Sequence, residues 1–257
     1  MFGYIPDVPD STDQSAENIL EGIPDAKTGS ISWSVVSILR QIGNSCTVHA
    51  VNQAGRCLAR INGDPNPPLW NLSIPYWDGR STPRTDNGAM PRKIFTAYYL
   101  YGYCLESAWP ISKESLSKAP PPRVRSQSYP QAGKLGYYRC SDNDANQRVK
   151  QIRRALSGSF PVVAGFTLDA AFVNYQGGLW SKTGPSVGRH YMLIVAFDGE
   201  GVLVCNSWGE DWGVTDENGL HRGGFAWISW KMLRDLSICT DVYVLTREQA
   251  VVTKESA

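Results

Sequence analysis

The sequence predicts an α+β fold, with helices in the N-terminal part and an antiparallel sheet in the C-terminal part. Three stretches before residue 160 have apolar residues at helical spacing. After residue 160 the pattern changes to short apolar runs separated by turn residues, which is typical of strands. At 257 residues, the chain is long enough to bury one substantial core, or two small lobes that share an interface.

Each predicted helix has a start or stop signal, or an apolar face. The first is expected over 45–61, where the apolar stripe ends before Gly63. The second begins at Pro91, a residue favoured at the first position of a helix, and ends before Gly102. The third is expected over 145–157, because its apolar residues lie on one side of the helix.

Five strands are expected, at 160–166, 191–197, 202–206, 224–229 and 241–245. The turn sequence DGEG between the second and third of them predicts a hairpin. A segment with three consecutive prolines, 111–133, is the best candidate for a linker. Residues 1–30 are rich in Pro, Asp, Ser and Gly, and they are expected to form an extended arm.

The charge composition argues against two classes of partner. The chain has 25 basic and 24 acidic residues, so no field of one sign would attract nucleic acid or anionic lipid. No stretch approaches the ~20 apolar residues needed to span a bilayer. The first residues have neither a basic start nor an apolar run, so no signal peptide is expected, although export by a specialised route stays open.

The six cysteines lie far apart and include no CxxC pair, which argues against a zinc site or a redox dithiol. If one of them is a catalytic thiol, an odd number remains, and an odd number fits a disulfide framework poorly. A reducing compartment such as the cytoplasm is therefore the expected location.

Cys46 is the candidate nucleophile. It lies in the sequence GNSCTVHA, residues 43–50, where a small, turn-forming stretch leads into the first predicted helix. Unpaired backbone N–H groups and the helix dipole at this position favour a thiolate. By itself the signal is weak, because a lone cysteine here is more often a small buried residue of a core helix.

Two distant residues strengthen this assignment. His190 directly precedes the second expected strand, and Asn206 ends the third. If these strands form the predicted hairpin, both side chains emerge at the same end of the sheet. The asparagine amide could then hold the imidazole and leave its other nitrogen for the thiol.

The segments GNSCTVHA, GRHYMLIVAFDG and CNSWGEDWG, in this order, resemble the Cys, His and Asn motifs of the papain-like cysteine peptidase family. The resemblance extends over nearly the whole chain, through 71–80, 86–111 and 224–233, and these segments look like those of bacterial and viral members. About 30 residues precede the core, so no long prosegment is expected.

This resemblance implies one catalytic unit over 1–257 with a papain-like two-lobe fold. A helical lobe of about 31–118 would carry Cys46, and an antiparallel β-barrel-like lobe of about 119–257 would carry the histidine and the asparagine. The active site would lie in the cleft between the lobes, and the arm 1–30 could cover part of it.

The resemblance also implies thiol-dependent hydrolysis of a peptide or protein substrate through an acyl-enzyme, with no metal or organic cofactor. Cys46 would be the nucleophile, His190 the general acid and base, and Asn206 the residue that orients the imidazole. Trp208 would shield the bond between histidine and asparagine from water. The Cys46 backbone N–H would form half of the oxyanion hole.

Three further residues are assigned from the resemblance. The family has an oxyanion-hole glutamine six residues before the cysteine. Here Arg40 is at that position and Gln41 follows it, so a one-residue deletion in the loop would let Gln41 donate. Asn87 and Gly88 match the segment that holds an extended substrate peptide in relatives. A tight turn before the helix at Pro91 explains the sequence DNG equally well.

Two other functions are compatible with the sequence. The same acyl-enzyme could be resolved by an amine, which would make the protein a transpeptidase or amidase. Alternatively, the fold could serve as a catalytically weak binding or structural component, for example of a virus particle. The displaced glutamine favours that second alternative, and the intact set of Cys46, His190 and Asn206 opposes it. The sequence indicates neither a substrate sequence preference nor a larger assembly.

Overall fold

The structure, a computed structural model, describes residues 2–80, 86–128 and 135–247. The α-helices are α1 (Glu17–Leu20), α2 (Cys46–Ile61), α3 (Ser73–Gly79), α4 (Pro91–Tyr101), α5 (Pro122–Ser128), α6 (Ala145–Ser157), α7 (Ala170–Val173) and α8 (Trp230–Arg234). Short 3-10 helices are η1 (Ser32–Ser34) and η2 (Glu106–Ala108). The strands are β1 (Gly29–Ser30), β2 (Gly136–Arg139), β3 (Val162–Leu168), β4 (Leu179–Trp180), β5 (Gly188–Phe197), β6 (Gly201–Cys205), β7 (Phe225–Ser229) and β8 (Cys239–Thr246).

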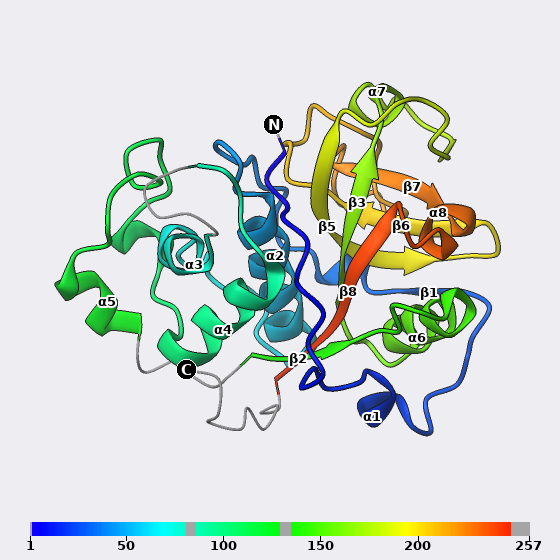
Figure 1. Ribbon diagram of the computed structural model, residues 1–257, viewed down its shortest axis with the longest axis horizontal. Helices are drawn as coiled ribbons and strands as arrows, with labels where there is room; N and C mark the ends of the chain where they lie inside the picture. The colour runs from blue at the N-terminus through cyan, green and yellow to red at the C-terminus, as the bar shows by residue number, and fades with distance from the viewer. Residues whose placement is uncertain (1, 81–85, 129–134, 248–257) are drawn as a thin grey trace.

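The helices and the sheet occupy two halves of the molecule. Helices α2 to α5 lie in one half, and the sheet with α6, α7 and α8 lies in the other (Figure 1). The strand order is β2-β8-β3-β5-β6-β7-β4, and β1 pairs with β5. Among the described strands the pairs are antiparallel except β4 with β7, which is parallel. The predicted α+β fold and the hairpin of β5 and β6 are therefore confirmed.

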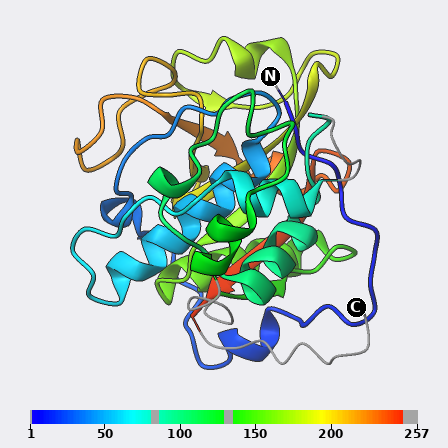
Figure 2. The ribbon, with the colours of Figure 1, turned by 90° about the vertical axis from the view of Figure 1, so that its left-hand side faces the viewer.

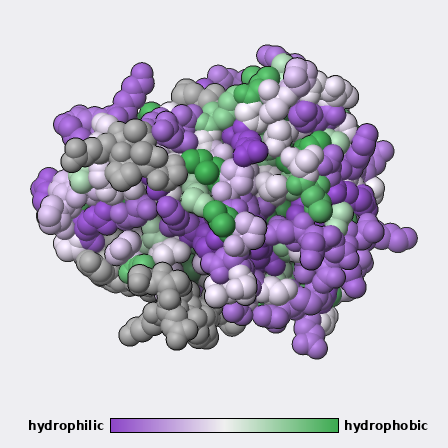
Figure 3. Space-filling model, viewed as in Figure 1, coloured by the Kyte–Doolittle hydropathy of each residue, from purple (hydrophilic) through white to green (hydrophobic). Residues whose placement is uncertain are grey.

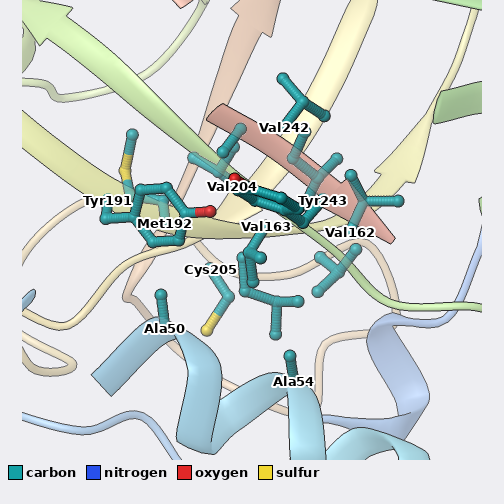
Figure 4. Close-up of a cluster of buried hydrophobic side chains, with 14 of the residues drawn as sticks. Ala50, Ala54, Val162, Val163, Tyr191, Met192, Val204, Cys205, Val242 and Tyr243 are labelled. Carbon is teal, nitrogen blue, oxygen red and sulfur yellow. The ribbon is translucent and has the colours of Figure 1, made fainter. Parts of the chain in front are cut away.

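Helix α2 joins the two halves, and almost all of its residues are buried. Ala50 and Ala54 face the buried side chains of the sheet (Figure 4). Because these side chains are small, the helix can approach the strands closely. On the helical side, Gly55 contacts the ring of Trp70, and a Cβ at this glycine would be 2.0 Å from a ring carbon.

The predicted helix signals act as expected. Helix α4 has Pro91 in its first turn and ends at Gly102, whose φ of 68° is in the left-handed region. Helix α6 begins after Asp144, and its carboxylate accepts hydrogen bonds from the backbone N–H groups of Asn146 and Gln147. The signals of α4 were predicted from the sequence, whereas α6 was predicted from its apolar side and the Asp144 cap is an additional finding.

The segment 111–133 is not the open linker that its prolines predicted. Helix α5 begins at Pro122, where a proline is compatible with the first turn. Val124 is only 2% exposed, and Arg125 forms an ion pair with Asp78 of α3. The helical half thus extends beyond the predicted boundary between the lobes. The end of the segment lies outside the described residues.

The N-terminal arm runs along the junction of the two halves. In Figure 1 its blue trace descends from the N label in front of α2, and in Figure 2 the same trace follows one edge of the molecule. Tyr4 forms a parallel bridge with Ala89 of the helical half, and Ser15 forms one with Arg139 of the sheet half. The arm therefore contacts both halves.

The face of the molecule in Figure 3 is mostly hydrophilic, and its apolar side chains form separate small patches. Val8, at 68% exposure, is the most exposed large apolar residue of the part of the chain that the structure describes. No helix within this part is long and apolar enough to cross a membrane.

Candidate active site

Cys46 is the first residue of α2 and is fully buried. The loop before it turns at Gly43, whose φ of 61° is in the left-handed region. Burial raises the pKa of the Cys46 thiol to about 11, although hydrogen bonds from the backbone N–H groups of Tyr191 and Thr47 oppose this shift. In this closed arrangement the thiol is neutral at neutral pH.

His190 and Asn206 are brought together by the hairpin of β5 and β6. The distance between His190 Nε2 and Asn206 Oδ1 is 2.6 Å. The asparagine Oδ1 also accepts a hydrogen bond from the backbone N–H of Ser207 at 2.7 Å, so the amide group has a defined orientation. Because Oδ1 can only accept, Nε2 must carry the proton in this bond.

The second nitrogen of the imidazole is free to act. His190 Nδ1 is buried and has no hydrogen-bond partner among the described residues. The backbone of the next residue, Tyr191, lowers the pKa of the Cys46 thiol, and helix α2, which begins with Cys46, packs against β5. Burial lowers the pKa of His190 to about 4, so the imidazole is neutral and Nδ1 can accept a proton.

Trp208 covers the bond between His190 and Asn206. Its ring centroid lies 4.7 Å from that of the imidazole. Phe172 and Trp212 pack against Trp208 at 6.0 and 5.0 Å, so the indole is held in place by other aromatic rings. The hydrogen bond is thereby kept in an apolar environment.

The N-terminal arm lies directly over this site. The backbone of Gly3 is one of the groups that lower the pKa of the Cys46 thiol, against the larger effect of burial. The Phe2 ring stands edge-on to both His190 and Trp208, at 6.4 and 6.2 Å between ring centroids. A Cβ at Gly3 would be 1.7 Å from the carbonyl oxygen of Asn44, so this close approach requires glycine. Phe2 and Gly3 therefore explain the complete burial of the nucleophile and the imidazole.

The arm passes the edge that the resemblance assigns to substrate. The backbone N–H of Ala89 donates to the carbonyl of Gly3 at 2.9 Å, and the N–H of Ile5 donates to the carbonyl of Ala89 at 3.2 Å. Gly88 has a φ of 95°, and a Cβ there would be 2.1 Å from the Gly3 carbonyl oxygen. Asn87 is exposed beside this edge. The structure therefore places Gly88 against an extended peptide and Asn87 toward solvent.

The side chain of Gln41 is buried, whereas that of Arg40 is largely exposed. The Gln41 side chain accepts a hydrogen bond from the Ser207 hydroxyl at 2.8 Å, and its Nε2 donates to the carbonyl of Gly43 at 3.0 Å. The Arg40 side chain is 63% exposed and pairs with Asp211. The glutamine is thus buried in the loop before Cys46.

A cavity of about 550 Å³ adjoins this loop, and it is lined by Phe2, Arg40, Gln41, Ala170, Val173, Asn174, Val187, Ser207, Trp208 and Trp212. Most of these side chains are apolar or aromatic. Because the lining comes from the arm, the loop before α2 and the sheet half, the cavity lies between the elements that carry the candidate site.

Sequence reasoning missed two groups at this site. It did not indicate that Phe2 would pack beside His190 and Gly3 against Asn44, or that Asp86 would bind the backbone of Asn44. No local pattern signals either contact, because each joins residues more than 40 positions apart. Within the described ranges there is no group of three or more His, Cys, Asp or Glu side chains that could hold a metal ion.

Comparisons with known proteins agree with this geometry. A family model for papain family cysteine proteases matches residues 86–223. The matched part includes His190 and Asn206 and begins beyond Cys46. An uncharacterized peptidase C1-like protein of Acanthamoeba polyphaga mimivirus is 23% identical over 279 aligned residues, which cover 95% of this chain and 86% of that protein.

Another sequence relative matches a smaller part of the chain, and two solved structures have a similar fold. Cathepsin B-like cysteine proteinase 3 of Ostertagia ostertagi is 38% identical over 79 residues, which cover 29% of this chain and 44% of that protein. Among solved structures, xylellain, a cysteine protease from Xylella fastidiosa, has a TM-score of 0.77 at 20% identity, with 96% of each chain covered. Digestive procathepsin L 3 of Tenebrio molitor has a TM-score of 0.67 at 20% identity, covering 90% of this chain and 75% of that one.

Proposed function

Because this chain belongs to the papain family of cysteine proteases, we propose that it hydrolyses peptide bonds through an acyl-enzyme on Cys46. The observation that carries the proposal is the buried imidazole of His190. One of its nitrogens is bound by Asn206, and the other has no partner among the described residues. His190 lies on β5, which packs against the helix that begins with Cys46. A neutral base held in this way is suited to take the proton of a thiol.

In the first half-reaction, the thiol proton of Cys46 moves to Nδ1 of His190, and the sulfur attacks the substrate carbonyl carbon. The C–N bond then breaks, and the leaving amine takes the proton from Nδ1. The product is a thioester on Cys46 and a free amine. Asn206 keeps the ring oriented throughout, because its Oδ1 accepts the hydrogen bond from Nε2.

In the second half-reaction, water gives a proton to Nδ1 and its oxygen attacks the thioester carbon. The C–S bond breaks, the acid product leaves, and the proton returns to the Cys46 sulfur. In both steps the oxygen of the tetrahedral intermediate needs donors. We assign these to the Cys46 backbone N–H and to the Nε2 group of Gln41, which would exchange its present bond to the Gly43 carbonyl for one to the oxyanion.

The substrate class that we propose is an extended peptide or protein segment. The backbone N–H and C=O of Ala89 both bind an extended chain in the present structure, that of the arm. The same groups, together with the open backbone at Gly88, would bind a substrate strand once the arm has moved. Asn87, which is exposed beside them, would contact the substrate side chains.

A reducing location is also proposed. The six cysteines are all buried. This supports the expectation from the sequence that the chain does not depend on disulfides.

The test is the rate at which a peptidyl epoxide alkylates each cysteine between about pH 5 and 8, measured by mass spectrometry. The full chain and its Gly3→Leu variant are compared, because a side chain at position 3 cannot fit against the Asn44 carbonyl. We expect rapid labelling of Cys46 alone in the variant, persisting at low pH and lost when His190→Ala is added. The five other buried thiols serve as internal controls.

Slow labelling spread over several cysteines, and rising only above about pH 8, would show unactivated thiols and contradict the proposal. The products formed from a substrate peptide then distinguish hydrolysis of the acyl-enzyme from its transfer to an amine. Hydrolysis yields a free acid, whereas a transpeptidase would yield a new amide when an acceptor amine is added.

A further inference from the structure

The loop 41–45 determines where two active groups lie, because it carries Gln41 at one end and leads into Cys46 at the other. The first end is attached to the sheet half, where the Gln41 backbone N–H donates to the carbonyl of Ser207 at 2.7 Å. The second end is attached to the helical half by a different kind of contact. There the backbone N–H of Asn44 meets the carboxylate of Asp86.

Asp86 binds Asn44 through both its side chain and its backbone. Both carboxylate oxygens lie 3.0 Å from the backbone nitrogen of Asn44. The Asn44 side-chain amide donates in return to the backbone carbonyl of Asp86 at 2.6 Å. Two residues that are far apart in the sequence are therefore held together by three contacts just before the nucleophile.

The carboxylate is itself held by Tyr76 of α3. The Tyr76 hydroxyl donates to Oδ1 of Asp86 at 2.5 Å. Burial and the adjacent Asp86 raise the pKa of Tyr76 well above its usual value, so the phenol remains a donor at neutral pH. Helix α3 thus fixes the carboxylate, and the carboxylate fixes the loop.

Gly43 makes this arrangement sterically feasible. A Cβ at Gly43 would be 2.0 Å from Oδ2 of Asp86, which is far inside a normal contact distance. The left-handed φ of 61° at the same residue also favours glycine. The residue that turns the loop is therefore also the one that leaves room for the carboxylate.

We infer that Asp86 is a positioning residue for the nucleophile, and that Tyr76 supports it in this role. The inference rests on the proposed function, because it concerns the geometry of the proposed acyl transfer. By fixing the amide of Asn44, the carboxylate sets the direction in which the loop enters α2, and so the position of Cys46 relative to Gln41. A displacement of about 1 Å at a reacting group can cost on the order of 10²-fold in rate.

The test uses the full chain with Gly3→Leu as the parent, to which Asp86→Ala, Asp86→Asn or Tyr76→Phe is added. The matched control is Asp78→Asn. Asp78 is on α3, like Tyr76, but its carboxylate pairs with Arg125. For each variant kcat and KM for a peptide are measured, with hydrogen exchange at the Asn44 amide and thermal unfolding.

We expect kcat to fall ~10²-fold in Asp86→Ala and about 10-fold in Asp86→Asn and Tyr76→Phe, with KM within about 2-fold of the parent. The partial rescue by asparagine follows from its one remaining acceptor oxygen. The Asn44 amide should exchange faster in all three variants. The control Asp78→Asn should leave kcat and the exchange rate unchanged.

Three results would overturn the inference. One is faster Asn44 exchange with unchanged kcat, which would make the contact structural only. Another is a higher kcat or faster Cys46 labelling in Asp86→Asn, which would mean that the carboxylate acts by opposing the thiolate charge. The third is a change in KM alone. If Asp86→Ala does not fold, Asp86→Asn and Tyr76→Phe provide the test of the inference. A parent that neither hydrolyses peptide nor labels at Cys46 would instead overturn the proposed function itself.

Discussion

The protonation states of single residues in the closed site follow from burial. The pKa of Cys46 is raised to about 11 and that of His190 is lowered to about 4, in both cases mainly because the charged form is kept from water. Proton transfer from sulfur to imidazole is therefore unfavourable while the arm covers the pair. Uncovering the site removes the main cause of both shifts and favours the thiolate–imidazolium pair.

The nucleophile can be tested by one truncation. Cys46→Ala should abolish peptide hydrolysis in the Gly3→Leu variant, because no other group is assigned to form the thioester. The change removes one buried sulfur, so the fold should persist in thermal unfolding. Cys57→Ala is the matched control, since Cys57 is a fully buried thiol of the same helix. Substantial turnover in Cys46→Ala would rule out the assignment.

The oxyanion donor is the second group that can be tested by a single truncation. Gln41→Ala should slow kcat by about 10²-fold or more, because one such donor typically contributes that much to the transition state. Steady-state kinetics would measure this loss. Gln147→Ala, an exposed glutamine on α6, should have no effect. An unchanged rate in Gln41→Ala would assign the oxyanion to other donors.

At the scale of elements, the hairpin of β5 and β6 explains the pairing of His190 with Asn206. In its register Leu193 is opposite Cys205, and because His190 precedes the first and Asn206 follows the second, both lie toward the same end of the hairpin. The arm is the element that opposes catalysis in the present arrangement. Its Gly3 packs against the carbonyl of Asn44, two residues before Cys46, and the missing side chain of Gly3 is needed for this contact.

The arm can be displaced without touching the catalytic groups. Gly3→Leu should raise the rate of Cys46 alkylation by at least an order of magnitude, because a Cβ would overlap the Asn44 carbonyl and the arm must move away. Gly199→Ala is the control, since a Cβ at Gly199 meets no atom within 4 Å. Equal labelling rates in wild type and Gly3→Leu would show that the arm does not limit access.

At the scale of the whole molecule, a buried cluster of charges ties the arm to both halves. The Asp7 carboxylate accepts hydrogen bonds from the backbone N–H of Arg92 in α4 and from the hydroxyl of Tyr243 in β8. The Asp7 backbone N–H donates to Asp241, which also pairs with Arg139. Displacing the arm near the nucleophile therefore leaves it attached at Asp7, provided that this cluster stays intact.

The cluster has a predictable pH dependence. Burial and the charge of Asp241 raise the pKa of Asp7 to about 6, whereas an unfolded aspartate titrates near 4. Between these values the folded state holds a proton that the unfolded chain has released, so this group lowers the stability as the pH rises from about 4 to 6. Asp7→Asn removes this titration.

We expect the stability of Asp7→Asn relative to wild type to increase by on the order of 1–2 kcal/mol between pH 4 and pH 7. Urea unfolding of both proteins at the two pH values would measure it. Buried histidines contribute a stability that rises with pH, in the opposite direction to Asp7. Because both proteins contain these histidines, their contribution cancels in the difference. Asp10→Asn, on the exposed part of the arm, should show no such gain. A relative stability that falls with pH would contradict the assignment.

Local patterns predicted much of the fold and the candidate triad. Helices α2, α4 and α6 have apolar faces or terminal residues that act within a few positions, so their bounds were close to the predicted ones. The hairpin followed from its turn, and it brought His190 and Asn206 together. The linker prediction failed because prolines are compatible both with an open segment and with the first turn of α5.

The sequence by itself determined the class of the fold, the family, and the meeting of a histidine and an asparagine at the end of a hairpin. These features depend on periodicity, turn residues and motifs, which act locally or as short recognisable segments. Only the tertiary structure decided that the Gln41 side chain is buried while that of Arg40 is exposed, that Asp86 binds Asn44, and that Phe2 and Gly3 pack beside His190 and Asn44. Each of these results from packing between distant segments, and such contacts leave no periodic signal along the chain.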